Sequence, residues 1–462
     1  MYKYLTKLSV CLLACVMLLG FAALPARAAV REDVDSILES FPEDQWPAQP
    51  ELNSQAAVIM EVNTGVMLYA KNATASSFPA STTKIMTGLL AVENCSMNDI
   101  VTISQKAISS LTPGSSHIGL KAGEQLTVQQ CMYGLLLPSA NEVAYALAEQ
   151  VSGNVKEFAS LMNARAAELG CVNTHFTNPS GLHDPQHYTC AYDLAKIFSA
   201  CAQNSAFMAV DSTPTYVLPA TNLTGEVRPM ATTHLMLRKG SPYYSQYVLG
   251  GKTGSTPEAG RCLVTYAKKD SLEIIVVTLH GEDSMQYADT QKLLDYAFSH
   301  FSCVRPSDAG AAGKTQAVSP LASQTGELAS FHMDGSSLVV LPDTLQFSDL
   351  KAEASYQQQE NGTAGTLTYT YQGYPLGKAV LMASAHEEGE LIYKKNTQTQ
   401  YHPAEEALEQ GSRLIVLRLW LLILGAVVLI LMGLGIYLLA RFFSPRNRND
   451  RKRRQKRGRL RY

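Results

Sequence analysis

The chain has 462 residues, a formal net charge of −2 and 46% hydrophobic residues. The charge is uneven, because residues 441–462 carry eleven Lys or Arg against one Asp, which leaves about −12 on the rest of the chain. An acidic main body gives no support to nucleic-acid binding, and we predict none. The length leaves room for more than one folded domain.

Residues 1–28 predict a secretory signal peptide. Lys3 and Lys7 precede an apolar stretch, and Ala26-Arg27-Ala28 places small residues at a cleavage position. Cys15 is a weaker sign of lipid attachment, because the apolar run continues past it. About 380 residues then lie between the signal and the next long apolar segment, and these are expected to be exported.

The exported part opens with a β-hairpin signal. "AAVIMEVNTGVMLYAKN", residues 56–72, contains two β-rich runs around Asn63-Thr64-Gly65. "FPASTTKIMTG", residues 78–88, follows. Pro79 is typical of a helix start, so Ser81 falls in a first turn and Lys84, three residues later, lies on the same face. On its own, this S-x-x-K spacing also fits a surface serine beside an ordinary lysine.

Helical patterns dominate from Ser81 to about Ala202. In "QQCMYGLLLPSANEVAYALAEQ", Pro138 ends one helix and the next begins near Asn141. Ser139-Ala140-Asn141 therefore lies at a corner from which side chains reach a cleft. The alternative is that Ser139 and Asn141 cap the second helix.

Strand patterns return at "YVLGGKTG", "RCLVTYAKK" and "LEIIVVTLHG", and "ADTQKLLDYAFSHF" reads as a closing amphipathic helix. Strands at both ends of a helical middle indicate an antiparallel sheet completed by both ends of the domain. Lys252-Thr253-Gly254 is expected to follow a strand, with Gly250, Gly251 and Gly254 leaving the backbone open to a ligand. A plain glycine-rich turn is the alternative.

We predict neither a metal nor a cofactor. The seven cysteines beyond the signal are scattered singly without a C-x-x-C, which does not resemble a disulfide framework. His183 and His187 have passable ligand spacing, but Asp184 and Pro185 between them mark a turn.

Residues 304–328, rich in Ala, Gly, Ser and Pro, predict a linker. Short alternating runs at 337–345, 365–373 and 379–385 predict a small all-β domain over residues 329–400. Residues 413–440 predict a transmembrane helix, because Leu419 to Ala440 carry no charge. The basic tail, 441–462, is then cytoplasmic and the catalytic part is outside, which predicts a single-pass protein of the cell membrane.

The order S-x-x-K, S-x-N, K-T-G on an exported chain resembles the low-molecular-mass penicillin-binding proteins, serine-type D-alanyl-D-alanine carboxypeptidases of peptidase family S11. The likeness covers about residues 50–303, and more weakly the β domain. It is carried also by the runs "NTGVMLYAKNA", "MNARAAELG", "FTNPSGLHDPQHYTCAYDLA" and "KTGSTPEAGRCLV". It implies an α+β (α/β sandwich) transpeptidase fold shared with β-lactamases, with an antiparallel sheet and a helical subdomain in a catalytic domain at 49–303.

The resemblance also implies the roles of the residues. Ser81 would attack the penultimate D-Ala carbonyl of a peptidoglycan stem peptide, with Lys84 as its base and Ser139 relaying a proton to the leaving amine. Asn141 would hold the substrate amide, and Lys252, Thr253 and Gly254 would line the site of the terminal carboxylate. The N–H groups of Ser81 and Ser255 would form the oxyanion hole. β-Lactam antibiotics are expected as covalent inhibitors.

Two rival functions remain. A class A β-lactamase would want a deacylating glutamate in an E-x-x-x-N arrangement, whereas Glu168 and Asn173 are five apart. A β-lactam sensor would want a signalling domain, which a short basic tail does not offer. The chain also departs from the family where Gln286 replaces an arginine found in many members, and where a span replaces the usual amphipathic C-terminal helix.

Overall fold

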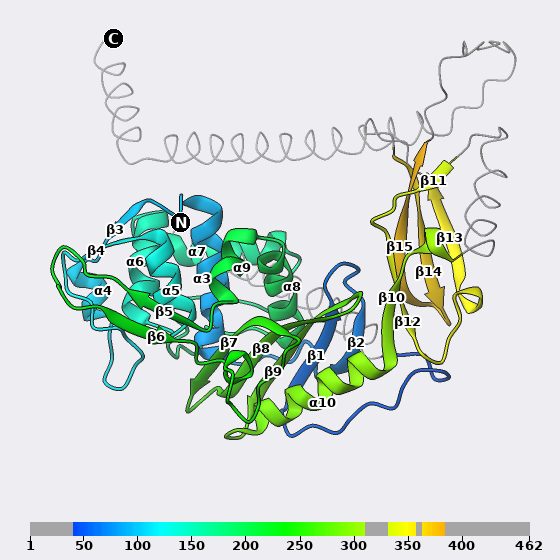
Figure 1. Cartoon of the computed structure of the whole chain (residues 1–462), viewed down its shortest axis with the longest axis horizontal. Helices are drawn as coiled ribbons and strands as arrows, with labels where there is room; N and C mark the ends of the chain where they lie inside the picture. The colour runs from blue at the N-terminus through cyan, green and yellow to red at the C-terminus, as the bar shows by residue number, and fades with distance from the viewer. Residues whose placement is uncertain (1–39, 310–330, 357–362, 384–462) are drawn as a thin grey trace, which may run out of the picture. The chain divides into compact units, whose positions relative to one another are not determined.

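The computed structural model describes residues 40–309, 331–356 and 363–383 (Figure 1). The predicted signal peptide, the predicted span at 413–440, the basic tail and most of the predicted linker lie outside these ranges. None of the helices within the described ranges combines the length and the apolarity needed to cross a bilayer.

A five-stranded sheet joins the two ends of the catalytic region, in the order β2-β1-β9-β8-β7. Every neighbouring pair is antiparallel. The predicted antiparallel sheet, closed by strands from both ends, is therefore confirmed. Its strands are β1 (Ala56–Glu61), β2 (Met67–Lys71), β7 (Val248–Thr256), β8 (Gly260–Lys269) and β9 (Leu272–Gly281).

Both faces of this sheet are covered, because side chains alternate along each strand. Val58 and Met60 of β1 join the core formed with the helices on one face. Ala57 and Ile59 join the other core, which includes Leu293 of α10 (Met285–His300). Helices thus lie on both faces of the sheet, as Figure 1 shows for α8 and α10. A sheet buried on both sides explains why β1 reads as an unbroken apolar run.

The helical subdomain lies between β2 and β7 in the sequence. Two short hairpins accompany it, β3 (Ile100–Thr102) with β4 (Gln125–Thr127) and β5 (Thr215–Leu218) with β6 (Arg228–Ala231). Its helices are η1 (Ala80–Thr83), α3 (Lys84–Asn94), α4 (Gln105–Ser109), α5 (Val128–Leu136), α6 (Asn141–Ser152), α7 (Val155–Glu168), α8 (Ala191–Ala202), α9 (Ser205–Asp211) and η2 (Leu235–Leu237).

A second sheet follows α10 directly. Its main order is β10-β12-β15-β14-β13, and β11 pairs with β15. Three of its strands overlap the runs from which the sequence predicted strands: β12 (Leu338–Pro342) and β14 (Thr363–Tyr371) closely, and β15 (Tyr374–Ala383) only in its second half, since it begins five residues before the predicted run. The others are β10 (Phe301–Val304), β11 (Phe331–Met333) and β13 (Lys351–Tyr356), and η3 (Pro306–Asp308) and η4 (Phe347–Asp349) are short turns. The hydroxyl of Tyr374 donates to the Met67 carbonyl at 2.7 Å, which ties this sheet to β2.

A buried carboxylate braces the two short hairpins. Glu124 is fully buried, and its Oε1 accepts from the guanidinium of Arg228 and from the hydroxyl of Thr221, each at 2.7 Å. Its charge is compensated by Arg228, whose side chain is 16% exposed.

We predict that Arg228→Ala lowers the free energy of unfolding by about 3 kcal/mol, because it leaves the Glu124 charge buried without its cation. Urea denaturation measures this loss. Arg165→Ala is the matched control, since that arginine pairs with Glu93 at the surface and should cost about 1 kcal/mol or less. Equal losses for the two variants would contradict the assigned role.

Candidate functional site

Ser81 lies in the 3₁₀ turn η1, immediately before α3 begins at Lys84. The sequence predicted a helical first turn here, and the turn is tighter than an α-helical one. In a 3₁₀ turn the side chains at i and i+3 eclipse each other, so the spacing of three brings the two groups together. The Lys84 Nζ lies 2.9 Å from the Ser81 Oγ.

The Lys84 amine is fully buried and has three oxygen partners from separate segments. Besides Ser81, they are the Asn141 side-chain oxygen at 2.7 Å and the Ser180 carbonyl at 2.8 Å. The pKa of Lys84 lies well below its ordinary value, first because burial disfavours the charged form and then because Lys252 is also cationic; Glu142 acts in the opposite direction. A lysine with a depressed pKa next to a serine is suited to accept the hydroxyl proton.

The corner between α5 and α6 is where the sequence placed it. Ala140 is the N-cap residue of α6 and no side chain caps this helix, so the alternative that Ser139 and Asn141 act as caps is wrong. Ser139 adopts the left-handed backbone conformation, with φ of 65°. Its hydroxyl is buried and is without a hydrogen-bond partner among the described residues. Strain and an unpaired polar atom at one residue are typical of functional positions.

Lys252-Thr253-Gly254 lies inside β7 rather than after a strand, which corrects the sequence prediction. Gly254 packs against η1, because a Cβ on it would approach the Pro79 carbonyl oxygen to 2.7 Å. Gly250 and Gly251 likewise face protein atoms, those of Asp211 and His234. These glycines therefore admit neighbouring parts of the chain, and the approach of a ligand to their backbone stays a prediction.

The side chains of Lys252, Thr253 and Ser255, also on β7, differ in their surroundings. Lys252 is 1% exposed, and burial lowers its pKa to about 8 although Asp211 acts against this. Thr253 hydrogen-bonds Thr233 through their hydroxyls at 2.6 Å. Ser255 is exposed and faces the same cleft as Ser81.

This cleft has a volume of about 230 Å³. It brings Ser81, Asn141 and Ser255 to one hollow, with the loop 112–116 and the segment 180–182 as further walls. These two segments were not predicted from the sequence to belong to the site. The turn residues in "TPGSS" and "NPSG" mark them as loops, but only a long-range contact, Asn141 N–H to the Ser116 carbonyl at 2.8 Å, places the first one here.

Arg261 is a further residue near the site that was not predicted from the sequence. It lies opposite Ser255 on β8, and its Nη1 donates to the Ser255 hydroxyl at 2.9 Å while its Nη2 pairs with Asp283 at 2.9 Å. Gln286, the residue noted in place of a family arginine, is buried at the start of α10, and its side-chain oxygen has no partner among the described residues. Positive charge next to Ser255 therefore comes from β8.

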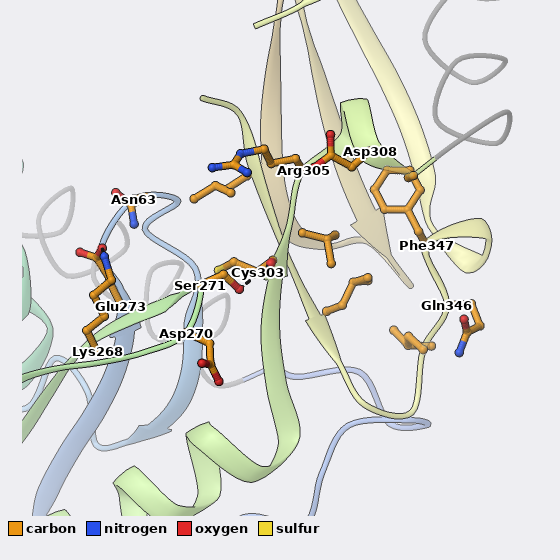
Figure 2. A pocket seen from close by; sticks show the side chains of 15 residues that line it. Asn63, Lys268, Asp270, Ser271, Glu273, Cys303, Arg305, Asp308, Gln346 and Phe347 are labelled. Carbon is orange, nitrogen blue, oxygen red and sulfur yellow. Dashed lines mark hydrogen bonds and ion pairs between the residues drawn. The ribbon is translucent and has the colours of Figure 1, made fainter. Parts of the chain in front are cut away.

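A larger cavity lies elsewhere, with a volume of about 680 Å³ (Figure 2). It is formed by the turn between β8 and β9, by β10 and by residues around β12. Its polar groups bond to one another, as with Lys268 to Glu273 and the Ser271 hydroxyl to the Cys303 carbonyl. None of the predicted site residues lines it, so cavity size and catalytic chemistry do not coincide here.

His187 lies next to the site, where its ring hydrogen-bonds Thr83 and Thr177. Its Nδ1 accepts from the Thr177 N–H at 3.0 Å, so its Nε2 carries the proton and donates to the Thr83 hydroxyl at 2.8 Å. Among the described residues no group of His, Cys, Asp and Glu has an arrangement that could hold a metal ion. The seven cysteines of the described ranges are all free.

A serine held by a lysine, without a histidine, is one of the arrangements that nature uses for nucleophilic acyl transfer. Comparison with known proteins agrees. A sequence model of the Peptidase S11 family, described as D-alanyl-D-alanine carboxypeptidase, matches residues 43–283. The chain belongs to this family.

Individual relatives show how far the likeness extends. The D-alanyl-D-alanine carboxypeptidase DacF of Bacillus subtilis is 35% identical over 54% of this chain, and the match spans 63% of that protein, less than two thirds of it. The D-alanyl-D-alanine carboxypeptidase of Streptomyces sp. K15 is 35% identical over 54% of this chain and 89% of that protein. The crystal structure of the Streptomyces K15 DD-transpeptidase aligns with a TM-score of 0.51 at 31% identity, covering 55% of this chain and all of that one. The penicillin-binding-protein-like α+β fold predicted from the sequence is thereby confirmed.

We predict that His187 makes the fold sensitive to acid. Burial lowers its pKa to about 4, below its ordinary 6.5, so its neutral form stabilises the fold. This contribution is complete above pH 6.5 and is lost as the pH falls towards 4, a loss of roughly 3 kcal/mol. Unfolding free energies measured at pH 7 and pH 4 should therefore differ less in His187→Asn than in the wild type. His183→Asn, on an exposed ring four residues earlier, should keep most of the wild-type difference, because the charge of His183 is the smallest of the causes that act on the pKa of His187.

Proposed function

We propose that the chain is a serine D-Ala-D-Ala carboxypeptidase, which removes the terminal D-alanine from peptidoglycan stem pentapeptides through an acyl-Ser81 intermediate. The observation that carries this proposal is the 2.9 Å contact between the Ser81 hydroxyl and the buried Lys84 amine. The catalytic domain is assigned to residues 49–303, the linker to 304–328 and the small β domain to 329–400, with the correction that β10 (Phe301–Val304) crosses the first boundary, because it pairs with β12 of the second sheet.

The surroundings of Lys84 prepare it for proton transfer. A neutral amine has two N–H groups and one lone pair. If its N–H groups donate to the Asn141 side-chain oxygen and the Ser180 carbonyl, the lone pair is directed at the Ser81 hydroxyl. Ser81 then passes its proton to Lys84 as its oxygen bonds to the substrate carbonyl carbon. Positioned proton transfer of this kind contributes about 10²–10⁴-fold to a rate.

Ser139 is assigned to the second proton transfer. Its buried hydroxyl has no competing partner among the described residues, so it is available to relay a proton to the departing D-Ala amine. Asn141 holds both Lys84 and the substrate amide. The N–H groups of Ser81 and Ser255 stabilise the oxyanion, and the close packing of Gly254 on η1 fixes their separation.

The terminal carboxylate of the substrate is assigned to Lys252 and Thr253. Arg261 donates to the Ser255 hydroxyl next to the cleft, and its charge is shared with Asp283. Guanidinium and ammonium groups are the usual partners of a carboxylate. This arrangement selects substrates that end in a free carboxylate.

The acyl-enzyme can be released by water or by an amine. The Streptomyces K15 relative is called a carboxypeptidase in one comparison and a DD-transpeptidase in the other. We assign hydrolysis as the main outcome, and analysis of products on native muropeptides separates it from transpeptidation.

The β-lactamase alternative loses its deacylating group in the structure. Glu168 ends α7, where it pairs with Arg165 and is 64% exposed, far from a buried catalytic position. β-Lactams are therefore expected to acylate Ser81, and the resulting acyl-enzyme is expected to be hydrolysed slowly.

We predict that Ser81→Ala abolishes covalent labelling by a fluorescent penicillin and the release of D-Ala from a pentapeptide, because it removes the hydroxyl next to Lys84. Gel fluorescence and D-Ala detection measure the two effects. Ser115→Ala, which removes a hydroxyl from the cleft wall away from the lysine, is the control and should stay labelled. Full labelling of Ser81→Ala, or rapid penicillin hydrolysis by the wild type without D-Ala release, would refute the assignment.

We also propose that residues 413–440 anchor the protein in the cell membrane, with the catalytic domain outside and residues 441–462 in the cytoplasm. The support is the uncharged run from Leu419 to Ala440 followed by the basic tail.

Deletion of residues 413–462 should release an active protein, because all predicted site residues precede residue 256. The full chain should instead sediment with membranes and resist extraction by alkaline carbonate. Extraction of the full chain by carbonate would contradict the anchor, and a folded but inactive truncated protein would show that the deleted segment contributes to catalysis.

A further inference from the structure

A buried carboxylate lies beneath the strand that carries Lys252. Asp211, the last residue of α9, is 3% exposed, and its Oδ2 accepts the backbone N–H of Gly251 at 2.6 Å. Gly251 directly precedes Lys252. None of the three sequence motifs includes Asp211, which lies 40 residues before Gly251 in the chain.

The contact occurs where β7 is irregular. β7 is the outermost strand of its sheet, and its register against β8 shifts between Val248 and Gly250. A bulge of this kind bends a strand and re-aims the side chains that follow it. Asp211 binds the backbone of β7 just after this shift, while Ser255 further along faces the cleft.

The two glycines of the bulge are shaped to this carboxylate and to a neighbouring histidine. A Cβ on Gly250 would collide with the Asp211 Oδ2. A Cβ on Gly251 would collide with the Val264 carbonyl oxygen of β8 and would lie 2.9 Å from the His234 Nε2. A side chain at position 250 would push β7 away from α9, so Gly250 allows the close approach that the hydrogen bond needs, while Gly251 allows close contact with β8 and His234.

The charges of the buried groups also link Asp211 to Lys252. The groups that act electrostatically on this part of the site are Asp211 on α9, His234 before η2, Lys252 on β7, and Lys84 on α3 with Glu142 next to it. Burial lowers the pKa of His234 to about 3, so it is neutral at working pH. Burial raises the pKa of Asp211 to about 7, and the hydrogen bond from the Gly251 N–H and then the charge of Lys252 oppose this rise. Asp211 is thus the group that favours the charged form of Lys252.

We propose that Asp211 is a positioning residue of the reaction: it fixes the backbone of the bulge directly before Lys252, whose Nζ donates to the Thr253 carbonyl at 3.1 Å, and its charge keeps Lys252 protonated. This inference rests on the proposed function. A protonated Lys252 serves twice, since it attracts the substrate carboxylate and disfavours protonation of Lys84. Asp211 therefore affects the protonation of Lys84, the base of Ser81, through Lys252 and without touching the substrate.

The variant Asp211→Asn tests the charge separately from the hydrogen bond, because an amide oxygen can still accept from the Gly251 N–H. Without the negative charge, Lys252 loses its proton at lower pH. The alkaline limb of kcat/KM for an acyl-D-Ala-D-Ala peptide should move down by about one pH unit, the low end of what a nearby opposite charge does to a pKa. On that limb the loss is about tenfold, whereas at pH 6.5 the variant should stay close to the wild type.

The substrate supplies a second readout. The alkaline loss should appear mainly in KM for peptides that end in a carboxylate, and be smaller for an ester substrate whose leaving group carries none. Asp211→Glu keeps the charge and should keep the wild-type limb. Asp289→Asn is the matched control, because this buried aspartate on α10 accepts the Ser54 N–H at 2.7 Å but lies outside the site. It should lower the unfolding temperature without moving the pH profile.

The measurements use the full chain in detergent, with thermal unfolding to verify each fold. An Asp211→Asn profile that overlies the wild type, or a loss that is equal at every pH, would overturn the proposal. If Asp211→Asn does not fold, a folded Asp211→Glu that loses the alkaline limb would overturn it as well. A wild type that neither releases D-Ala nor reacts with penicillin would instead refute the proposed function, which separates the two failures.

Discussion

The hydrogen bonds of the buried Lys84 amine are the constraint on which the rest of the site depends. An amine removed from water is costly unless each of its bonds is satisfied, and here three oxygens surround it. They come from η1, from the start of α6 and from the loop at Ser180. These segments must therefore meet at one point, and the cleft is the space that remains in front of them.

Close backbone contacts hold that meeting point in place. Gly254 brings β7 against η1, and Gly181, with φ of +82°, lies so near the Ala80 carbonyl that any Cβ would collide with it. Ala80 and Ser139 both adopt left-handed conformations, which cost energy outside glycine. Such strain persists because the sheet and the helices packed around it leave no room to relax. The nucleophile is held in a fixed position before substrate arrives.

Charges of opposite sign are arranged through the interior of the site. The negative charge of Asp211 favours the charged form of Lys252. The positive charge of Lys252 disfavours the charged form of Lys84, and the charge of Glu142 favours it. In a low-dielectric interior these groups influence one another strongly, so the protonation of one sets that of the next. The site is thus better described as one coupled set of groups than as a serine with separate helpers.

The sequence by itself determined what depends on neighbours along the chain. The spacing of Ser81 and Lys84, the hairpin around Asn63-Thr64-Gly65 and the corner after Pro138 are set within a few residues, because turn geometry and proline act locally. The β-rich runs predicted the strands of the main sheet, and the short alternating runs predicted those of the small β domain, for the same reason. The order of the three motifs, together with the family resemblance, then indicated the chemistry.

Only the tertiary structure decided which distant groups meet. Lys84 reaches Asn141 and Ser180, which are 57 and 96 residues away, because α3 packs between the corner and the loop. It also showed that the glycines of β7 face Asp211, His234 and η1, that Arg261 stands beside Ser255, and that the catalytic cleft is not the largest cavity. A contact of this kind depends on how whole elements pack, and no short stretch of sequence contains that information.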